Sequence, residues 1–163
     1  MKRANGYIPP NATLIPDEKA TCVFQGVHTD VWHWEQELFD GSTTTFEMTK
    51  RPDVVFILAI IDGKLLIQDE QQPHIGSFSN IPAGMVNSSD GEDELAGAKR
   101  ELKEETGYEF SDWKLVDGFQ PVDRVEQFLY VFVASGTYTK GDRKLDPGEK
   151  LTPPPLISAQ ALP

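Results

Sequence analysis

Three glutamates crowd one face of a predicted helix near the middle of the chain. Residues 100–108 read RELKEETGY, and Glu101, Glu104 and Glu105 stand there at i, i+3 and i+4. Like charges at these spacings repel by roughly 0.2–0.5 kcal/mol per pair, and carboxylates in a last turn also face the negative end of the helix dipole. Both effects destabilise the isolated helix, so the pattern indicates that a partner not encoded in this segment compensates the negative charge. Because hard cations such as Mg²⁺ take carboxylate ligands, the segment predicts a metal-bearing helix.

The same segment carries the signals of a helix that packs on a core. Leu95, Ala98 and Leu102 recur at i, i+3 and i+7 and form an apolar stripe beside the carboxylates. We expect the helix over residues 92–106, with Ser89 or Asp90 near its N-cap and Gly107 as the residue that ends it.

A merely acidic, solvated surface helix is the plainer alternative, and two adjacent glutamates before a glycine are compatible with it. The full string R-E-apolar-x-E-E-x-G-apolar is far more restrictive. From average residue usage it arises by chance about once in ten thousand chains of this length. The metal-bearing interpretation is therefore preferred.

At these positions the sequence resembles the Nudix hydrolase family, whose motif reads G-x5-E-x7-R-E-U-x-E-E-x-G-U, where U is apolar. One departure is plain, because seven residues rather than five separate Gly84 from Glu92, and the extra length lies in residues 85–91, ahead of the helix. The positions that match are Glu92, Arg100, Glu101, Leu102, Glu104, Glu105, Gly107 and Tyr108.

The resemblance implies an α+β chain with the Nudix fold, a mixed β-sheet sandwiched between helices (α/β/α), preceded by an N-terminal antiparallel β-hairpin unit. Residues 1–50 would form the lead-in and this unit, residues 51–150 the catalytic core, and residues 151–163 an irregular, proline-rich tail. Relatives usually continue past residues 145–150 with a strand and a closing helix. We therefore expect a truncated or altered end that lacks part of one helical layer.

Local patterns predict the elements around the helix. Asp40-Gly41 is a hairpin signal between two β-branched and aromatic runs, and Asp62-Gly63 follows a buried apolar strand. The expected strands are residues 21–39 with an interruption, 43–49, 54–61, 65–68, 80–83, 113–117 and 127–134, and the expected loops are residues 71–79, 120–126 and 136–149.

The family cleaves the P–O–P bridge of a nucleoside diphosphate linked to another moiety by attack of water. By resemblance, Glu101, Glu104 and Glu105 would hold two or three Mg²⁺ or Mn²⁺ ions, and the main-chain carbonyl of Ala83 would be a further ligand. Arg100 is expected to orient Glu104 or another helix carboxylate rather than to meet substrate. Glu92 lies at the start of the helix, where a negative charge suits the helix dipole. A purely structural role is the alternative to a role in the chemistry for this residue.

The catalytic set implied by the resemblance contains Glu104 and Glu105, together with a general base from outside the motif. Glu126 and Glu149 are the candidates, since each lies beside a predicted strand end. An ordinary surface glutamate explains either residue equally well. Asp142 and Asp146 are weaker candidates for the same role.

Pro82-Ala83-Gly84, the N-terminal strands and Arg51-Pro52 resemble the ADP-ribose pyrophosphatase branch of the family. In that branch the N-terminal strands often build a homodimer, and aromatic side chains there stack on adenine. The substrate contacts implied here are Trp34 and Phe46 on the base, with Trp32 as another aromatic, Arg51 on a phosphate or ribose, and Gln72 in the loop before the motif. Core or interface packing is the alternative for the aromatics.

Composition restricts the partners and the compartment. A formal charge of −11 argues against nucleic acid or an anionic membrane as the main partner, whereas bound cations would allow a phosphate substrate. Cys22 is the only cysteine, which favours a cytoplasmic location, and we expect it to be a small buried residue. The longest apolar run, residues 54–61, is too short to span a bilayer, and no signal peptide precedes it.

Two functions therefore remain open from the sequence. The first is a metal-dependent hydrolase of ADP-ribose or a related nucleotide sugar. The second is a non-catalytic, nucleotide-binding Nudix module, although such a module has no need of three clustered glutamates.

Overall fold

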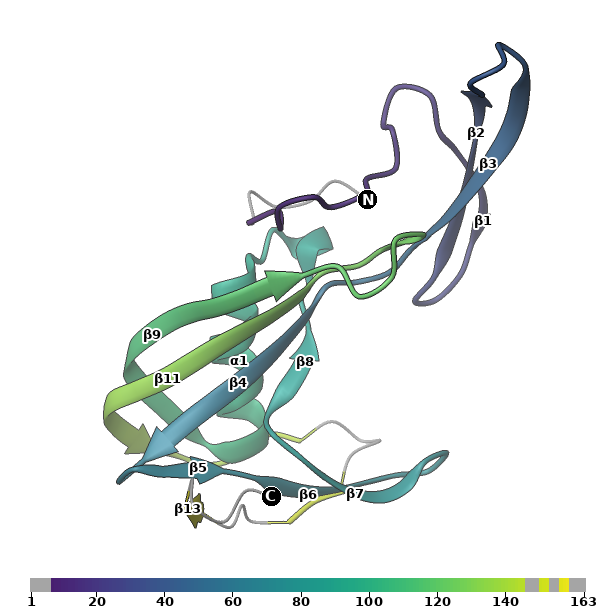
Figure 1. Cartoon of the computed structure of the whole chain (residues 1–163). Helices are drawn as coiled ribbons and strands as arrows, with labels where there is room; N and C mark the ends of the chain where they lie inside the picture. The colour runs from purple at the N-terminus through teal and green to yellow at the C-terminus, as the bar shows by residue number, and fades with distance from the viewer. Residues whose placement is uncertain (1–6, 146–149, 153–155, 159–163) are drawn as a thin grey trace.

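The N-terminal part of the chain forms an antiparallel sheet that projects from the rest of the molecule (Figure 1). The computed structural model describes residues 7–145, 150–152 and 156–158. Strands β1 (Thr21–Gln25), β2 (Asp30–Glu37) and β3 (Thr43–Lys50) pair in sequence order. The turn between β2 and β3 lies at the expected Asp40-Gly41, and Gly41 has φ 82°. The predicted N-terminal hairpin is confirmed.

The central sheet is mixed. Strand β4 (Val54–Ile61) runs parallel to β11 (Leu129–Lys140) and antiparallel to β5 (Lys64–Leu66) and β8 (Ala83–Met85), while β11 also pairs antiparallel with β9 (Tyr108–Phe119). A further short strand, β13 (Leu156–Ser158), pairs with β5. A parallel β4–β11 pair requires a long crossover, and the helix lies within that connection.

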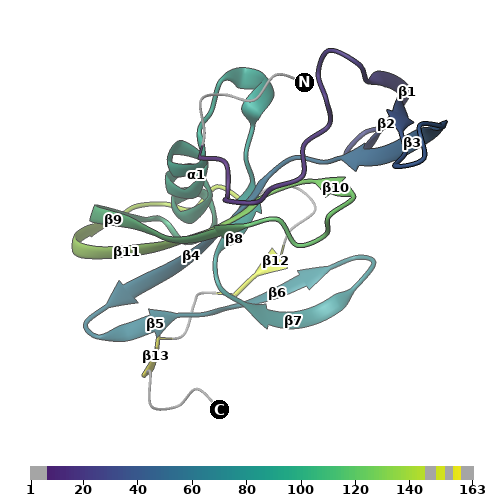
Figure 2. The same ribbon diagram turned by 45° about the horizontal axis from the view of Figure 1, so that its top comes forward.

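Helix α1 (Glu94–Thr106) covers one face of this sheet, as Figures 1 and 2 show. Alternate residues of β4 and β11 are buried beneath it, together with Ala98 and Leu102 of the helix. The predicted apolar stripe is thus confirmed at these two positions, and Leu95 packs against the same core while partly exposed. The opposite face of β4 is only half-buried.

The helix begins two residues later than expected. Asp93, not Ser89 or Asp90, is the N-cap, and its carboxylate accepts a hydrogen bond from the Ala96 N–H at 2.7 Å. Ser88–Asp90 instead form a short 3₁₀ turn, η1, which takes up the extra length before Glu92. The expected end at Gly107 is confirmed, since that glycine has φ 78°.

Several polar segments predicted as loops are strands. Residues 71–79 belong to a hairpin of β6 (Gln68–Gln72) and β7 (Gly76–Asn80), which β12 (Lys150–Leu151) joins as a third strand. Residues 136–140 continue β11, and β10 (Val125–Glu126) pairs parallel with β3. In each case backbone pairing outweighs the weak strand propensity of the side chains.

The α+β class with a mixed sheet and an N-terminal antiparallel unit agrees with the expectation. Within the described residues helix α1 supplies a helical layer on one face of the central sheet. The truncated or altered end stays a prediction. The tail is not wholly irregular, because Leu151 and residues 156–158 enter strands.

Two expectations from composition meet different outcomes. Cys22 is exposed rather than buried, because β1 is an edge strand whose five residues are all exposed. Across the part of the chain that the structure describes, no helix combines the length and apolar character needed to cross a bilayer.

Candidate active site

Arg100 ties the carboxylates of α1 to the loop before the helix. Its Nε and one terminal nitrogen donate to the two oxygens of Glu92 at 2.9 and 3.1 Å. The other terminal nitrogen donates to Glu101 Oε1 at 2.8 Å and to Glu104 Oε2 at 3.0 Å. The carbonyl of Met85 accepts a further bond at 2.8 Å. These bonds agree with the expectation that Arg100 orients Glu104 or another helix carboxylate, which stays a prediction.

Glu92 fixes the loop rather than the chemistry. Its Oε2 also accepts a hydrogen bond from the Asn87 N–H at 2.8 Å. Burial raises the pKa of the Glu92 carboxyl, but the bonds from Arg100 and Asn87 outweigh it, so the pKa lies below its ordinary value. The bonds donated to Glu92 and Glu101 raise the pKa of Arg100, more than burial lowers it. Both groups are therefore charged at neutral pH, and the structural reading of Glu92 is favoured.

Strand β8 passes directly beside the helix carboxylates. A Cβ at Gly84 would overlap the carboxylate of Glu101, so only glycine leaves room for that side chain. The neighbouring Ala83 donates its N–H to Glu105 Oε2 at 3.3 Å. The glycine of the motif is therefore explained by close approach between β8 and α1.

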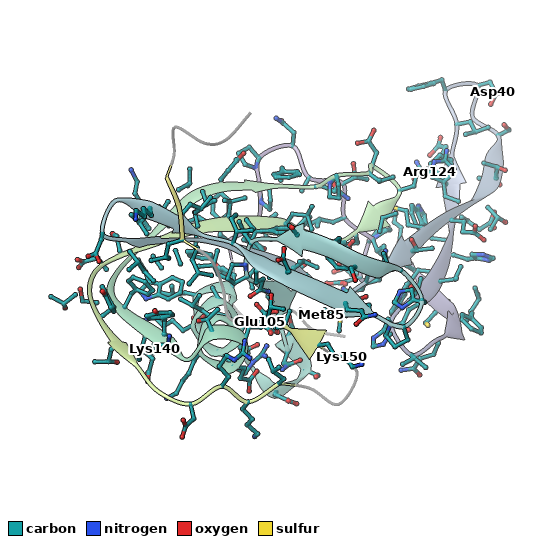
Figure 3. The ribbon with its side chains drawn as sticks, turned by 90° about the horizontal axis from the view of Figure 1, so that it is seen from below. Asp40, Met85, Glu105, Arg124, Lys140 and Lys150 are labelled. Carbon is teal, nitrogen blue, oxygen red and sulfur yellow. The ribbon has the colours of Figure 1, made fainter. Side chains whose placement is uncertain are left out.

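Glu105 is the most deeply placed of the three glutamates, and Figure 3 labels it in the middle of the molecule. The residue is 5% exposed. Its Oε2 also accepts a bond of 2.9 Å from Nε2 of Gln68, on β6. The contact between Gln68 and Glu105 was not predicted from the sequence. The only available signal was the polar residue at the end of the otherwise apolar strand expected over residues 65–68.

The donor set at α1 and β8 fits a hard divalent cation. Carboxylate and carbonyl oxygens are what Mg²⁺ and Mn²⁺ take, and Glu101 and Glu105 lie against Gly84 and Ala83. In the described residues, however, no three acidic, His or Cys side chains are gathered around one point. Glu101 and Glu104 are turned to Arg100.

Glu126, a candidate base, lies elsewhere. It is 4% exposed, and it pairs with Lys50 Nζ at 2.7 Å and accepts a bond from the Ile15 N–H at 2.6 Å. These contacts anchor the lead-in and β3 to β10. Because its carboxylate is occupied by Lys50 and the Ile15 N–H, its arrangement favours a structural role.

Trp34 and Phe46 do come together. Their ring centroids lie 5.8 Å apart, and the guanidinium carbon of Arg124 lies 5.3 Å from the centroid of the Phe46 ring. All three residues line a pocket of about 410 Å³. The other lining residues are Thr13, Leu14, Pro16, Gln36, Glu47, Met48 and Asp123. Trp34 is also 8% exposed and packs with Ile15 and Met48, so it serves a small second core as well.

The remaining predicted residues are scattered. Arg51 is exposed at the end of β3, and its N–H donates to the carbonyl of Glu126 at 3.2 Å. Gln72 lies at the end of β6 and donates to Glu70. Asp142 is exposed in the segment after β11. Glu149 and Asp146 lie outside the described residues.

Known proteins resemble this chain in sequence and in fold. A NUDIX domain model matches residues 50–159, more than half of the chain. A protein named methanol dehydrogenase activator from Bacillus methanolicus is 31% identical over 126 residues, covering 75% of this chain and 66% of that protein. The ADP-ribose pyrophosphatase of Bacillus subtilis (strain 168) is 30% identical over 131 residues, covering 78% and 70%.

A solved structure described as an ADP compounds hydrolase has a TM-score of 0.63 at 22% identity, and the match covers 85% of this chain and 74% of that one. At this identity the likeness shows the fold. The chain spans about two thirds of the length of the two sequence relatives. Because the NUDIX domain model matches more than half of the chain, the chain belongs to the Nudix hydrolase family.

Proposed function

We propose that this protein is a divalent-metal-dependent hydrolase of the pyrophosphate bond in a nucleoside diphosphate linked to another moiety. ADP-ribose or a nucleotide sugar is the favoured substrate, giving a nucleoside monophosphate and a sugar phosphate. The observation that carries the proposal is the close approach of Glu101 and Glu105 to the backbone of Gly84 and Ala83. The name of the 30% identical relative, an ADP-ribose pyrophosphatase, supports the choice of substrate.

The reaction adds water across the P–O–P bridge. A water oxygen forms a bond to one phosphorus, the bridging P–O bond breaks, and the departing phosphate keeps the bridging oxygen. When bound, two or three Mg²⁺ or Mn²⁺ ions would neutralise phosphate oxygens and lower the pKa of water. Glu101, Glu104, Glu105 and the Ala83 carbonyl would hold these ions.

Arg100 has a positioning role in this proposal. Its fork holds Glu101 and Glu104 on one side of α1 while its other bonds fix the loop through Glu92. Because a guanidinium keeps its charge at any working pH, it lowers the mutual repulsion of the glutamates while the site is empty. The locally unfavourable charge pattern therefore has a partner in the resting protein.

A general base would take the proton of the attacking water, and Glu149 is the favoured candidate. Glu149 lies outside the described residues; among those that the structure describes, Lys144 donates its N–H to the carbonyl of Glu104 at 2.8 Å, so the segment after β11 reaches the last turn of α1. Glu126 is the weaker candidate because Lys50 already binds it.

The pocket on the N-terminal sheet would take the base of the substrate. Trp34 and Phe46 offer apolar ring surface, and Arg124 supplies a positive charge for a phosphate or ribose. Arg51 and Gln72 would contact the remainder of the substrate. The pocket is built on the sheet that projects from the catalytic part, so we infer that a second copy completes the site, through a cytoplasmic homodimer of the N-terminal strands (Figure 1).

A non-catalytic nucleotide-binding module is the second candidate. It is favoured by one observation, that Glu101 and Glu104 are turned to Arg100 and that no three acidic, His or Cys side chains of the described residues are gathered around a point. Such a module would bind nucleotide with little dependence on a divalent cation.

A product assay separates the two candidates. Purified protein is incubated with ADP-ribose, other nucleotide sugars, NADH and dinucleoside polyphosphates, with Mg²⁺ and with chelator, and the products are separated by ion-exchange chromatography. We expect Mg²⁺-dependent AMP and ribose 5-phosphate from ADP-ribose. Turnover of another compound alone would replace the substrate, and a folded protein that turns over none of them would favour the binding module.

A further inference from the structure

The side-chain amide of Gln68 is buried, and only its NH₂ group has a hydrogen-bond partner among the described residues. Gln68 is the first residue of β6 and is 1% exposed. Its Nε2 donates to Glu105 Oε2 at 2.9 Å, across 37 residues of sequence. Its Oε1 is buried and has no hydrogen-bond partner in the residues that the structure describes.

The orientation of this amide follows from its neighbour. A glutamate carboxylate only accepts hydrogen bonds, so the side of Gln68 that faces Glu105 must be the NH₂ group. The carbonyl oxygen is therefore the atom left without a partner, and the amide cannot be flipped to exchange them. A buried acceptor in this state loses its hydrogen bonds to water without replacing them, which destabilises the folded protein.

The bond to Glu105 explains the NH₂ group of Gln68, but folding alone gives no reason for its unsatisfied carbonyl oxygen. Leu66, two residues earlier, is fully buried and apolar, and a methionine of similar length would fill the space of Gln68 without an unsatisfied atom. The unsatisfied oxygen lies on the same small planar group that bonds Glu105. A donor that arrives with the ligand of Glu105 would satisfy it.

The second contact of Glu105 strengthens the case. The Ala83 N–H bonds the same oxygen, Oε2, at 3.3 Å. Two donors from separate strands, β6 and β8, thus hold one carboxylate oxygen and fix the rotation of the group. Partners of this kind set the orientation of metal ligands, and their loss typically weakens metal binding 10- to 100-fold.

We propose that Gln68 is a positioning residue of the cation site, an inference that rests on the hydrolase function above. Its NH₂ group holds Glu105 in the orientation that binds the cation. Its carbonyl oxygen accepts a hydrogen bond from a water molecule carried by that cation, since Mg²⁺ keeps several waters when it binds to proteins.

The test uses the whole chain and Mn²⁺ without substrate. Free Mn²⁺ is followed by electron paramagnetic resonance during titration of the wild type, Gln68→Met and Gln127→Met. Gln127 is the matched control, because its side-chain amide also donates a hydrogen bond, to the carbonyl of Pro52 at 2.7 Å, and it belongs to no part of the proposed site. We expect the Kd for Mn²⁺ to rise about tenfold or more in Gln68→Met and to stay within twofold in Gln127→Met.

Equal affinity of the wild type and a folded Gln68→Met would overturn the positioning role while leaving the hydrolase proposal intact. A wild type that binds no Mn²⁺ would contradict both. Side-chain amide signals of the ¹⁵N-labelled wild type give a measurement that needs no variant. Mg²⁺ should shift the Gln68 signals and leave those of Gln127 in place; unmoved Gln68 signals at saturating Mg²⁺ would also overturn the proposal.

Discussion

Arg100 and Glu92 form a two-pronged ion pair, with bonds of 2.9 and 3.1 Å, that closes the loop between β8 and α1. The Arg100 side chain is 28% exposed and that of Glu92 is 15% exposed. Because the same guanidinium also holds Glu101, the fork joins the loop to the proposed cation site. The two extra residues of the loop leave this pairing intact.

Removing the charge of Glu92 should destabilise the protein in a pH-dependent manner. We expect Glu92→Gln to lower the free energy of unfolding by about 1–3 kcal/mol at pH 7. The pKa of Glu92 lies below its ordinary value of 4.5, so its contribution is complete above that value and is lost as the pH falls through the lower, folded-state pKa. The difference between wild type and variant should therefore shrink in acid, which urea unfolding at several pH values measures.

Glu109→Gln is the matched control for that series. Glu109 pairs with Lys103 at 2.9 Å, but both side chains are more than half exposed. Its substitution should change stability by less than about 0.5 kcal/mol. Equal effects of the two substitutions, or a Glu92→Gln difference that persists undiminished at low pH, would contradict the role of the fork.

Gly84→Ala should damage the cation site and spare the fold. The added Cβ would overlap the Glu101 carboxylate and displace it. We expect Mn²⁺ affinity to fall about 10- to 100-fold, as for lost supporting contacts of a metal site, with little change in far-UV circular dichroism. Gly141→Ala is the control, since a Cβ there meets nothing closer than 3.9 Å. Unchanged affinity in Gly84→Ala would refute the close approach of β8 to a metal ligand.

Phe46→Leu should affect substrate binding more than turnover. If the ring stacks on the base, its loss costs about 1–2 kcal/mol, which is roughly a 5- to 30-fold rise in KM, with kcat near that of the wild type. Phe39→Leu makes the same change at a fully exposed position on the same hairpin and should leave KM alone. An unchanged KM in Phe46→Leu would remove the pocket from the substrate site.

The sequence was sufficient for those features that depend on neighbours along the chain. The carboxylate face of α1, the apolar alternation of β4 and the turn at Asp62-Gly63 follow from local spacing and turn chemistry. Positive φ angles of 51° at Asp62 and 73° at Gly63 agree with that turn.

Features that depend on distant partners were not predictable. The hairpin of β6 and β7 is polar, and its strands are defined by backbone pairing with each other and with β12. The end of β11 was predicted as a loop because it is polar. In the structure it pairs with β9 beyond a register shift, and the ring centroids of Tyr138 and Tyr108 lie 5.6 Å apart. The burial of Glu126 depends on Lys50, and the role of Gln68 depends on Glu105; neither pair is adjacent in sequence.

The most direct test of the central claim compares the wild type with the double variant Glu104→Gln, Glu105→Gln for AMP release from ADP-ribose at saturating Mg²⁺. If these glutamates hold the catalytic ions, the double variant should lose turnover by at least about a thousandfold, while its affinity for the nucleotide stays within severalfold. AMP release by the double variant at the wild-type rate, or wild-type turnover that persists in chelator, would contradict the account.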